Sequence, residues 1–86
     1  FDVLSIDWGE RNFVNPPYNN LKIWCKKSYE QFLLNKLVVM LIPARTDTSA
    51  WHDYCMLATE IRFLRGRLRF DGGARAPFPS CLIIFK

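Results

Sequence analysis

An unbroken apolar run at residues 37–42, closed by Pro43, restricts the fold of this chain more than any other feature. The run has six residues, Leu-Val-Val-Met-Leu-Ile, whereas a membrane-spanning helix needs about 20. A short, continuous run of branched apolar residues is typical of a strand buried on both faces, as in a parallel sheet with helices on either side. The sequence therefore predicts an α/β fold without a membrane segment.

Apolar residues recur at helical spacing on both sides of this run. The first predicted helix begins at Asn20, with Asn19 or Asn20 as its N-cap. Its apolar face consists of Leu21, Trp24, Cys25, Tyr29, Phe32 and Leu33. The second predicted helix is shorter, covers residues 50–59 and takes Thr48 or Ser49 as its N-cap. Its inner side holds Trp51, Tyr54, Cys55 and Ala58.

Three further segments complete the predicted sheet. Residues 12–15 form a strand that is stopped by Pro16 and Pro17, because proline has no amide hydrogen and a fixed φ. Residues 60–64, extended in one alternative by residues 67–70, and residues 81–85 are the last two strands. No helix separates these two, so we expect an antiparallel hairpin. The chain is thus predicted to be one domain of about four strands and two helices.

The net charge of +4 comes from one short stretch. The arginine cluster (Arg62, Arg65, Arg67, Arg69 and Arg75) is accompanied by a single acidic residue, Asp71, and the remainder of the chain sums to zero. Alternation along a strand would place Arg65, Arg67 and Arg69 on one face. Such a stripe attracts phosphate or acidic surfaces, and a solvated strand face is the alternative.

Cysteine and histidine residues give little sign of metal or disulfide chemistry. The three cysteines, Cys25, Cys55 and Cys81, are odd in number and widely spaced, and each has large apolar neighbours. We therefore expect buried free thiols in a reducing compartment. His52 is the only histidine, so no metal site is expected, and it is interpreted as a surface residue on a short helix.

The clearest chemical signal is the NPPY turn (Asn15, Pro16, Pro17 and Tyr18), directly after the first strand and before the first helix. Open α/β sheets bind ligands beyond the carboxyl ends of their strands. The side-chain oxygen of Asn15 and the carbonyl of Pro16 offer two acceptors for an amino group, and Tyr18 offers a ring for stacking on a base. The alternative is a turn that simply ends the strand.

The sequence resembles the phage-type DNA adenine methyltransferases, relatives of the Dam enzymes. The resemblance covers nearly the whole chain in order. It includes residues 5–8, the NPPY turn, and residues 24–28, 38–48, 51–54, 60–70 and 76–80. It implies a partial Rossmann-like methyltransferase sheet, S-adenosylmethionine as cofactor, adenine in DNA as substrate, and a cytoplasmic location in a bacterium that carries a phage or prophage.

The resemblance also implies roles for individual residues. The Asn15 side chain and the Pro16 carbonyl would hold the target amino group, Pro17 would stiffen the turn, and Tyr18 would stack on a flipped adenine. Catalysis would rest on positioning and electrostatics, without a covalent intermediate. Arg45 and the stripe of Arg65, Arg67 and Arg69 become candidate phosphate contacts. For Arg45, a salt bridge with Asp47 stays open as the alternative.

The chain departs from the family pattern in its cofactor site. Fourteen residues precede Asn15, and they hold neither a strong apolar strand nor a glycine-rich turn. Residues 1–86 are therefore expected to be the catalytic-motif half of a methyltransferase-like domain, with the cofactor-binding half absent. Self-association or a second chain would then complete the site. The alternative function is a non-catalytic, nucleic-acid-binding remnant of such an enzyme.

Overall fold

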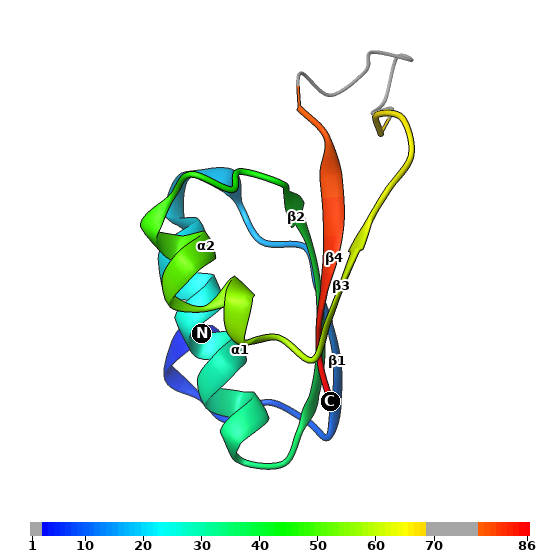
Figure 1. Ribbon diagram of the computed structural model, residues 1–86. Helices are drawn as coiled ribbons and strands as arrows, with labels where there is room; N and C mark the ends of the chain where they lie inside the picture. The colour runs from blue at the N-terminus through cyan, green and yellow to red at the C-terminus, as the bar shows by residue number, and fades with distance from the viewer. Residues whose placement is uncertain (1–2, 69–77) are drawn as a thin grey trace.

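The computed structural model describes residues 3–68 and 78–86, and within them the strands form one mixed four-stranded sheet in the order β1-β2-β4-β3 (Figure 1). The strands are β1 (Arg11–Val14), β2 (Leu37–Pro43), β3 (Glu60–Phe63) and β4 (Ser80–Phe85). β1 runs parallel to β2, and β4 runs antiparallel to both β2 and β3. The predicted α/β fold and the antiparallel pairing of the last two strands are confirmed.

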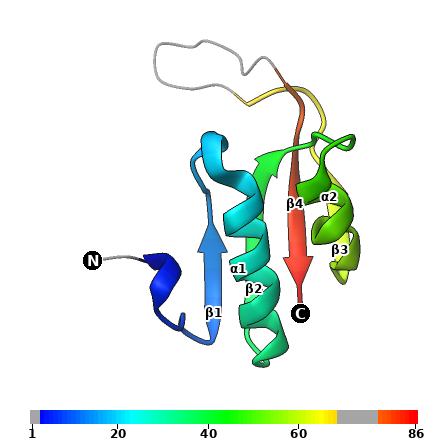
Figure 2. The ribbon, with the colours of Figure 1, turned by 90° about the vertical axis from the view of Figure 1, so that its left-hand side faces the viewer.

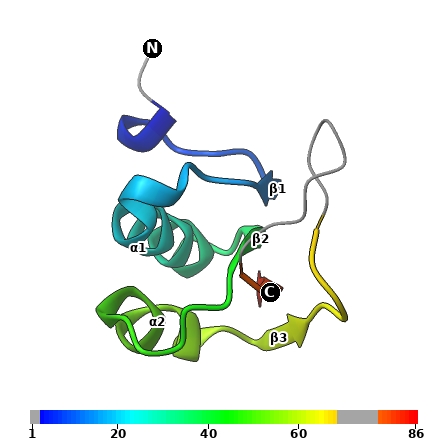
Figure 3. The ribbon, with the colours of Figure 1, turned by 90° about the horizontal axis from the view of Figure 1, so that it is seen from above.

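Two α-helices and three short 3₁₀ turns accompany the sheet. They are η1 (Val3–Ser5), η2 (Tyr18–Asn20), α1 (Leu21–Leu33), α2 (Ser49–Asp53) and η3 (Cys55–Leu57). Figures 1 and 3 show α1 and α2 side by side on the same face of the sheet. In Figure 2 this helical layer lies in front of the strands, with α1 over β2. The expectation of helices on either side is therefore wrong for the described residues, whose helices cover one face only.

The burial of β2 follows from this one-sided layer. Val38, Met40 and Ile42 are buried beneath the helices, whereas Leu37, Val39 and Leu41 alternate with them and are half-buried. The uniformly apolar run suggested a strand covered on both faces, because a run without alternation gives no sign of which face is open. The other side of the sheet, here called the open face, carries Arg11, Phe13, Val39, Leu41, Arg62 and Leu82.

The core lies between the sheet and the two helices. Met40, Ile83 and Phe85 contribute its largest apolar side chains from the two central strands, and the Phe85 ring packs 5.5 Å from that of Phe32 on α1. Burial of side chains of this size contributes roughly 1.5–3 kcal/mol each to folding. The prediction of a buried Leu33 is wrong, because that side chain is 59% exposed at the end of α1.

The ends of α1 differ in how they are capped. Asn20 stands at the N-cap, but its side chain makes no capping hydrogen bond. At the other end Asn35 has φ of 66°, its amide donates to the Phe32 carbonyl, and the Lys36 amide donates to that of Gln31. This is a Schellman motif, which satisfies carbonyls that the helix leaves unpaired. The chain can therefore turn directly into β2.

The second helix is shorter than predicted. α2 ends at Asp53, and Tyr54 leaves the helical region before η3 begins. Its N-cap is confirmed, since the Trp51 amide donates to the Thr48 hydroxyl at 3.3 Å. Trp51 and Cys55 are buried as expected. The apolar spacing of residues 50–59 thus reflects two short helical turns that bury the same side rather than one continuous helix.

Gln31 ties the segment before β1 to the helical layer. Its buried side-chain oxygen accepts from the Trp8 amide and from Lys36 Nζ, both at 2.8 Å, and its Nε2 donates to Asp7 at 3.2 Å. Lys36 Nζ also donates to the Trp8 carbonyl at 2.5 Å. This network holds the segment that leads into β1 against the end of α1.

Candidate active site

The NPPY turn leaves the sheet at the carboxyl end of β1. Asn15 follows the last residue of the strand, Pro16 is buried, and Pro17 has extended backbone angles of −64° and 143° before η2 begins at Tyr18. The strand predicted over residues 12–15 ends one residue earlier, at Val14, so Asn15 is free of the ladder. Its side chain is exposed and makes no hydrogen bond within the described part of the chain.

Two other chain segments meet the NPPY turn at this edge of the sheet. β2 is parallel to β1, so the loop that follows β2 and contains Arg45 leaves from the same edge. β4 is antiparallel, so the segment that precedes it, with Phe78, arrives there as well (Figure 1). The site is therefore built from three segments that are far apart in the sequence.

The Phe78 ring contacts both Tyr18 of the NPPY turn and Arg45 of the loop after β2. It meets the Tyr18 ring edge to face, with centroids 5.0 Å apart and planes at 89°. The guanidinium carbon of Arg45 lies 5.4 Å from the centre of the same ring. Among the described residues Arg45 forms no ion pair with Asp47, so it contacts an aromatic ring instead. Phe78 was not predicted as a site residue; the only signal was an aromatic residue between Pro77 and Pro79, inside a matched segment.

Three hollows surround the NPPY turn. A shallow one of about 430 Å³ is lined by the turn itself. A cavity of about 230 Å³ extends from Tyr18 between α1 and α2, past Lys22, Arg45 and Trp51. A third, of about 560 Å³, follows β1 from Asn15 toward Trp24 and Trp8. Asn15 and Tyr18 thus each border two hollows.

The arginine cluster is only partly described, and its predicted stripe is wrong where it is described. β3 ends at Phe63, so Arg65 and Arg67 follow the strand rather than alternate along it, and Gly66 between them has φ of 74°. Both side chains are exposed. Arg69, Arg75 and the predicted strand extension over residues 67–70 lie wholly or partly outside the described residues. A basic surface at this end of the molecule therefore comes from a loop.

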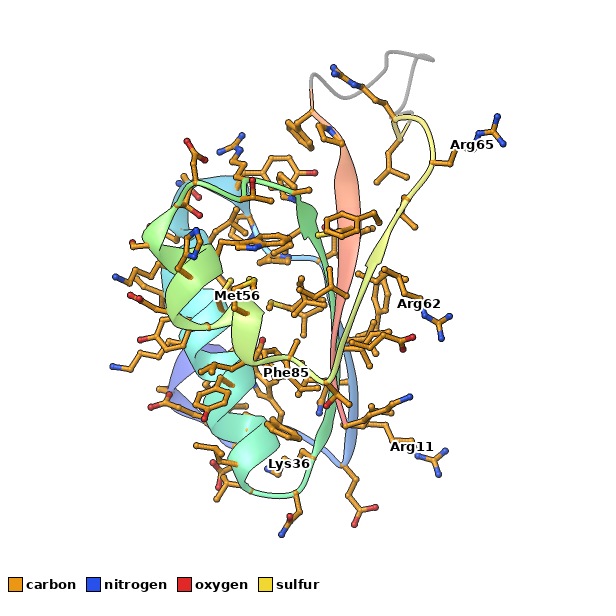
Figure 4. The ribbon with its side chains drawn as sticks, in the orientation of Figure 1. Arg11, Lys36, Met56, Arg62, Arg65 and Phe85 are labelled. Atoms are coloured by element: carbon orange, nitrogen blue, oxygen red, sulfur yellow. The ribbon has the colours of Figure 1, made fainter. Side chains whose placement is uncertain are left out.

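Figure 4 shows the directions of three arginines. Arg11, Arg62 and Arg65 all point away from the helical layer. Arg62 Nε lies 3.1 Å from Glu60, and this hydrogen bond lowers the pKa of the Glu60 carboxyl below its usual value. Arg62 is thereby partly neutralised, whereas Arg65 and Arg67 form no ion pair with any described residue. Of the three arginines of the cluster that the structure describes, Arg65 and Arg67 are therefore the ones without a carboxylate partner.

His52 and the three cysteines are not grouped as metal ligands in the described part of the chain. His52 is exposed on α2, as predicted, and its Nε2 lies 2.8 Å from the Thr46 carbonyl. The three cysteines are buried and free. Across residues 3–68 and 78–86 no group of three or more histidine, cysteine or acidic side chains is arranged to hold a metal ion. In the same residues no helix is long and apolar enough to cross a membrane.

Comparison with known proteins shows which family the chain belongs to. Residues 1–79 match the family model described as DNA N-6-adenine-methyltransferase (Dam). The chain belongs to this family. A DNA N-6-adenine-methyltransferase of Escherichia phage T1 is similar to it, with 35% identity over 66 residues, which are 74% of this chain and 28% of the phage protein. No solved structure matches. The chain thus spans just over a quarter of the length of this methyltransferase relative, and the resemblance noted in the sequence is confirmed.

Proposed function

We propose that this Dam-family chain holds the target adenine of a DNA N-6-adenine methyltransferase at the NPPY turn. The observation that carries the proposal is Asn15, an exposed amide immediately beyond β1, bordering both the hollow of the turn and the hollow along β1. The location is the carboxyl edge of parallel strands, where open α/β sheets bind their ligands. We also propose that the sheet is part of a Rossmann-like methyltransferase sheet.

The chemistry of the turn suits an amino group attached to a planar base. The Asn15 side-chain oxygen and the Pro16 carbonyl can each accept one N–H, which leaves the nitrogen lone pair directed at a methyl donor. Tyr18 offers its ring for stacking, and Phe78 packs against the edge of this ring. A base held in this way has left the duplex, at a cost of a few kcal/mol. The rate enhancement then comes from positioning and from fixed acceptors.

The methyl donor implied by the family is S-adenosylmethionine, and the described residues do not form a complete site for it. Neither described glycine provides a cradle: a Cβ at Gly9 would meet only Asn12, at 4.0 Å, and one at Gly66 would meet nothing within 4 Å. We therefore assign cofactor binding to polypeptide outside residues 3–68 and 78–86, in the same protein or in a partner copy. The hollow along β1, which reaches Asn15, is the surface that this polypeptide would adjoin.

The test is transfer of labelled methyl groups from S-adenosylmethionine to DNA that contains adenine. We expect Asn15→Ala to lower the transfer rate by about 10²–10³-fold, the effect of removing one aligned hydrogen-bonding group at a reacting centre. The matched control is Asn19→Ala, since Asn19 is also exposed and lies in η2 beside the turn. Equal rates for the wild type and Asn15→Ala would contradict the role of Asn15.

A second candidate function is DNA binding without methyl transfer. It is favoured by the absence of a glycine cradle among the described residues. It predicts that the chain binds DNA through its arginines and that S-adenosylmethionine has no effect on this binding. Absence of transfer by the wild type, together with retained DNA binding, would favour this second function.

A further inference from the structure

Two thiols meet where the helical layer closes over the core. Cys25 lies on α1 and Cys55 begins η3, and their Sγ atoms are 3.8 Å apart although the residues are 30 positions apart in the sequence. Both residues line the cavity of about 230 Å³ that starts at Tyr18. Methyl transfer as proposed above uses neither thiol.

The third cysteine is in a different situation. Cys81 lies on β4, and its thiol donates to the Ile42 carbonyl across the sheet at 3.7 Å. Burial raises the pKa of the Cys81 thiol to about 11. The hydrogen bond between the two thiols lowers the pKa of Cys25 and raises the pKa of Cys55. Because the thiolate is the reactive form, we expect Cys25, whose pKa is lowered, to be the attacking thiol.

We propose that Cys25 and Cys55 form an oxidation site, which a peroxide reaches through the adjoining cavity and converts to a disulfide. The sulfur atoms need to move from 3.8 Å to about 2.0 Å. Both thiols are shielded from bulk water, so a reagent has to be small enough to enter the cavity. Hydrogen peroxide meets this requirement, whereas a bulky disulfide such as that of glutathione does not.

The reaction proceeds in two balanced steps. The Cys25 thiolate attacks one oxygen of hydrogen peroxide, the O–O bond breaks, and the products are a sulfenic acid on Cys25 and hydroxide, which takes a proton to become water. The sulfur of Cys55 then attacks the Cys25 sulfur, loses its proton and displaces the hydroxyl group as a second water. Overall, two thiols are oxidised to one disulfide, and one peroxide is reduced to two waters.

The disulfide would restrict the movement of α1 relative to η3, next to the candidate site. This helix starts three residues after Tyr18, and η3 follows α2, whose preceding loop carries Arg45. A covalent link between α1 and η3 therefore fixes two walls of the cavity that begins at Tyr18. Oxidation is expected to raise the thermal midpoint of unfolding, since a cross-link that closes a long loop restricts the unfolded chain.

The experiment exposes the native chain to hydrogen peroxide, then blocks and counts its thiols in denaturant. We expect a loss of about 2 Da, a decrease from three free thiols to one, and a peptide that links Cys25 to Cys55, all reversed by dithiothreitol. Cys81→Ser should form the same Cys25–Cys55 disulfide as the wild type. Cys25→Ser should remain without an internal disulfide, and Cys55→Ser should stop at the sulfenic acid.

Three results would overturn the proposal: three thiols surviving peroxide, a linked peptide that contains Cys81, or cross-links between chains in place of the internal one. Peptide mapping of the wild type decides the matter even where a serine variant fails to fold. None of these measurements depends on methyl transfer, so the oxidation site and the proposed function can fail independently.

Discussion

Phe78 contacts two residues that come from different parts of the chain, Tyr18 and Arg45. Its ring packs against the edge of the Tyr18 ring, which the proposed function uses for stacking, and lies next to the Arg45 guanidinium. Edge-to-face aromatic pairs contribute about 0.5–1.5 kcal/mol beyond the area they bury. This contact is therefore large enough to measure in the stability of the chain alone.

A double-mutant cycle isolates the Tyr18–Phe78 contact. We expect Tyr18→Ala and Phe78→Ala to be non-additive in the free energy of urea-induced unfolding, with a coupling energy of about 1 kcal/mol. The matched control pairs Tyr18→Ala with Phe32→Ala, an aromatic residue at the far end of α1, roughly 20 Å along the helix axis. The contact is refuted if both cycles give the same coupling.

At the scale of residues, the sequence indicated the part of the candidate site that is continuous in the chain. The NPPY turn was recognisable because two prolines end a strand wherever they occur, and Asn15 and Tyr18 are adjacent to them. Phe78 was not recognisable, since its contact with Tyr18 depends on β4 lying antiparallel beside β2. The arginine stripe failed for a local reason: β3 ends at Phe63, before the arginines that were expected to alternate.

Among the elements, α1 determines how the chain enters β1, through the buried side chain of Gln31. This side chain pairs with the Trp8 amide, with Lys36 and with Asp7. Leucine has nearly the same volume but offers no hydrogen bond. Its introduction would leave the Trp8 amide and the Lys36 ammonium without one of their acceptors.

We therefore expect Gln31→Leu to destabilise the fold by about 1–3 kcal/mol, the cost of partly buried polar groups that lose their partners. Urea unfolding measures this change. Glu30→Leu is the control, because Glu30 is the exposed neighbour on the same helix and should change stability by less than about 0.5 kcal/mol. Similar losses in the two variants would mean that the Gln31 network contributes little.

Element types were easier to predict than element ends. The spacing from Leu21 to Phe32 identified α1, and the apolar run identified β2. The second helix was placed over residues 50–59 because apolar spacing persists through η3, whereas the backbone leaves the helix at Tyr54. The position of β4 between β2 and β3 was missed, because strand order depends on contacts across the sheet rather than on local spacing.

For the whole molecule, we expect Arg65 and Arg67, which follow β3, to contribute to DNA affinity. Each phosphate contact made by an arginine steepens the dependence of log K on log salt by about 0.9. We expect Arg65→Gln combined with Arg67→Gln to reduce this slope by about 1.8, equally for different DNA sequences. Fluorescence anisotropy at several salt concentrations measures it.

The control removes two positive charges elsewhere, by Arg11→Gln and Lys26→Gln. Arg11 lies on β1, away from Arg65, and Lys26 is exposed on α1 (Figure 4). The two double variants then have the same net charge. A difference between their salt slopes would therefore come from the positions of the removed charges. Identical slopes would show that the arginines act through net charge alone.

The order of the strands has a consequence for synthesis of the chain. Of the four strands that the structure describes, β4 is translated last, yet it is the neighbour of both β2 and β3. While the ribosome is still adding residues before Ser80, β3 has no partner in this sheet and β2 has only β1. Folding of this unit is therefore delayed until Phe85 has left the exit tunnel. Until then β2 and β3 of the nascent chain keep unpaired edges, which favour association with other chains.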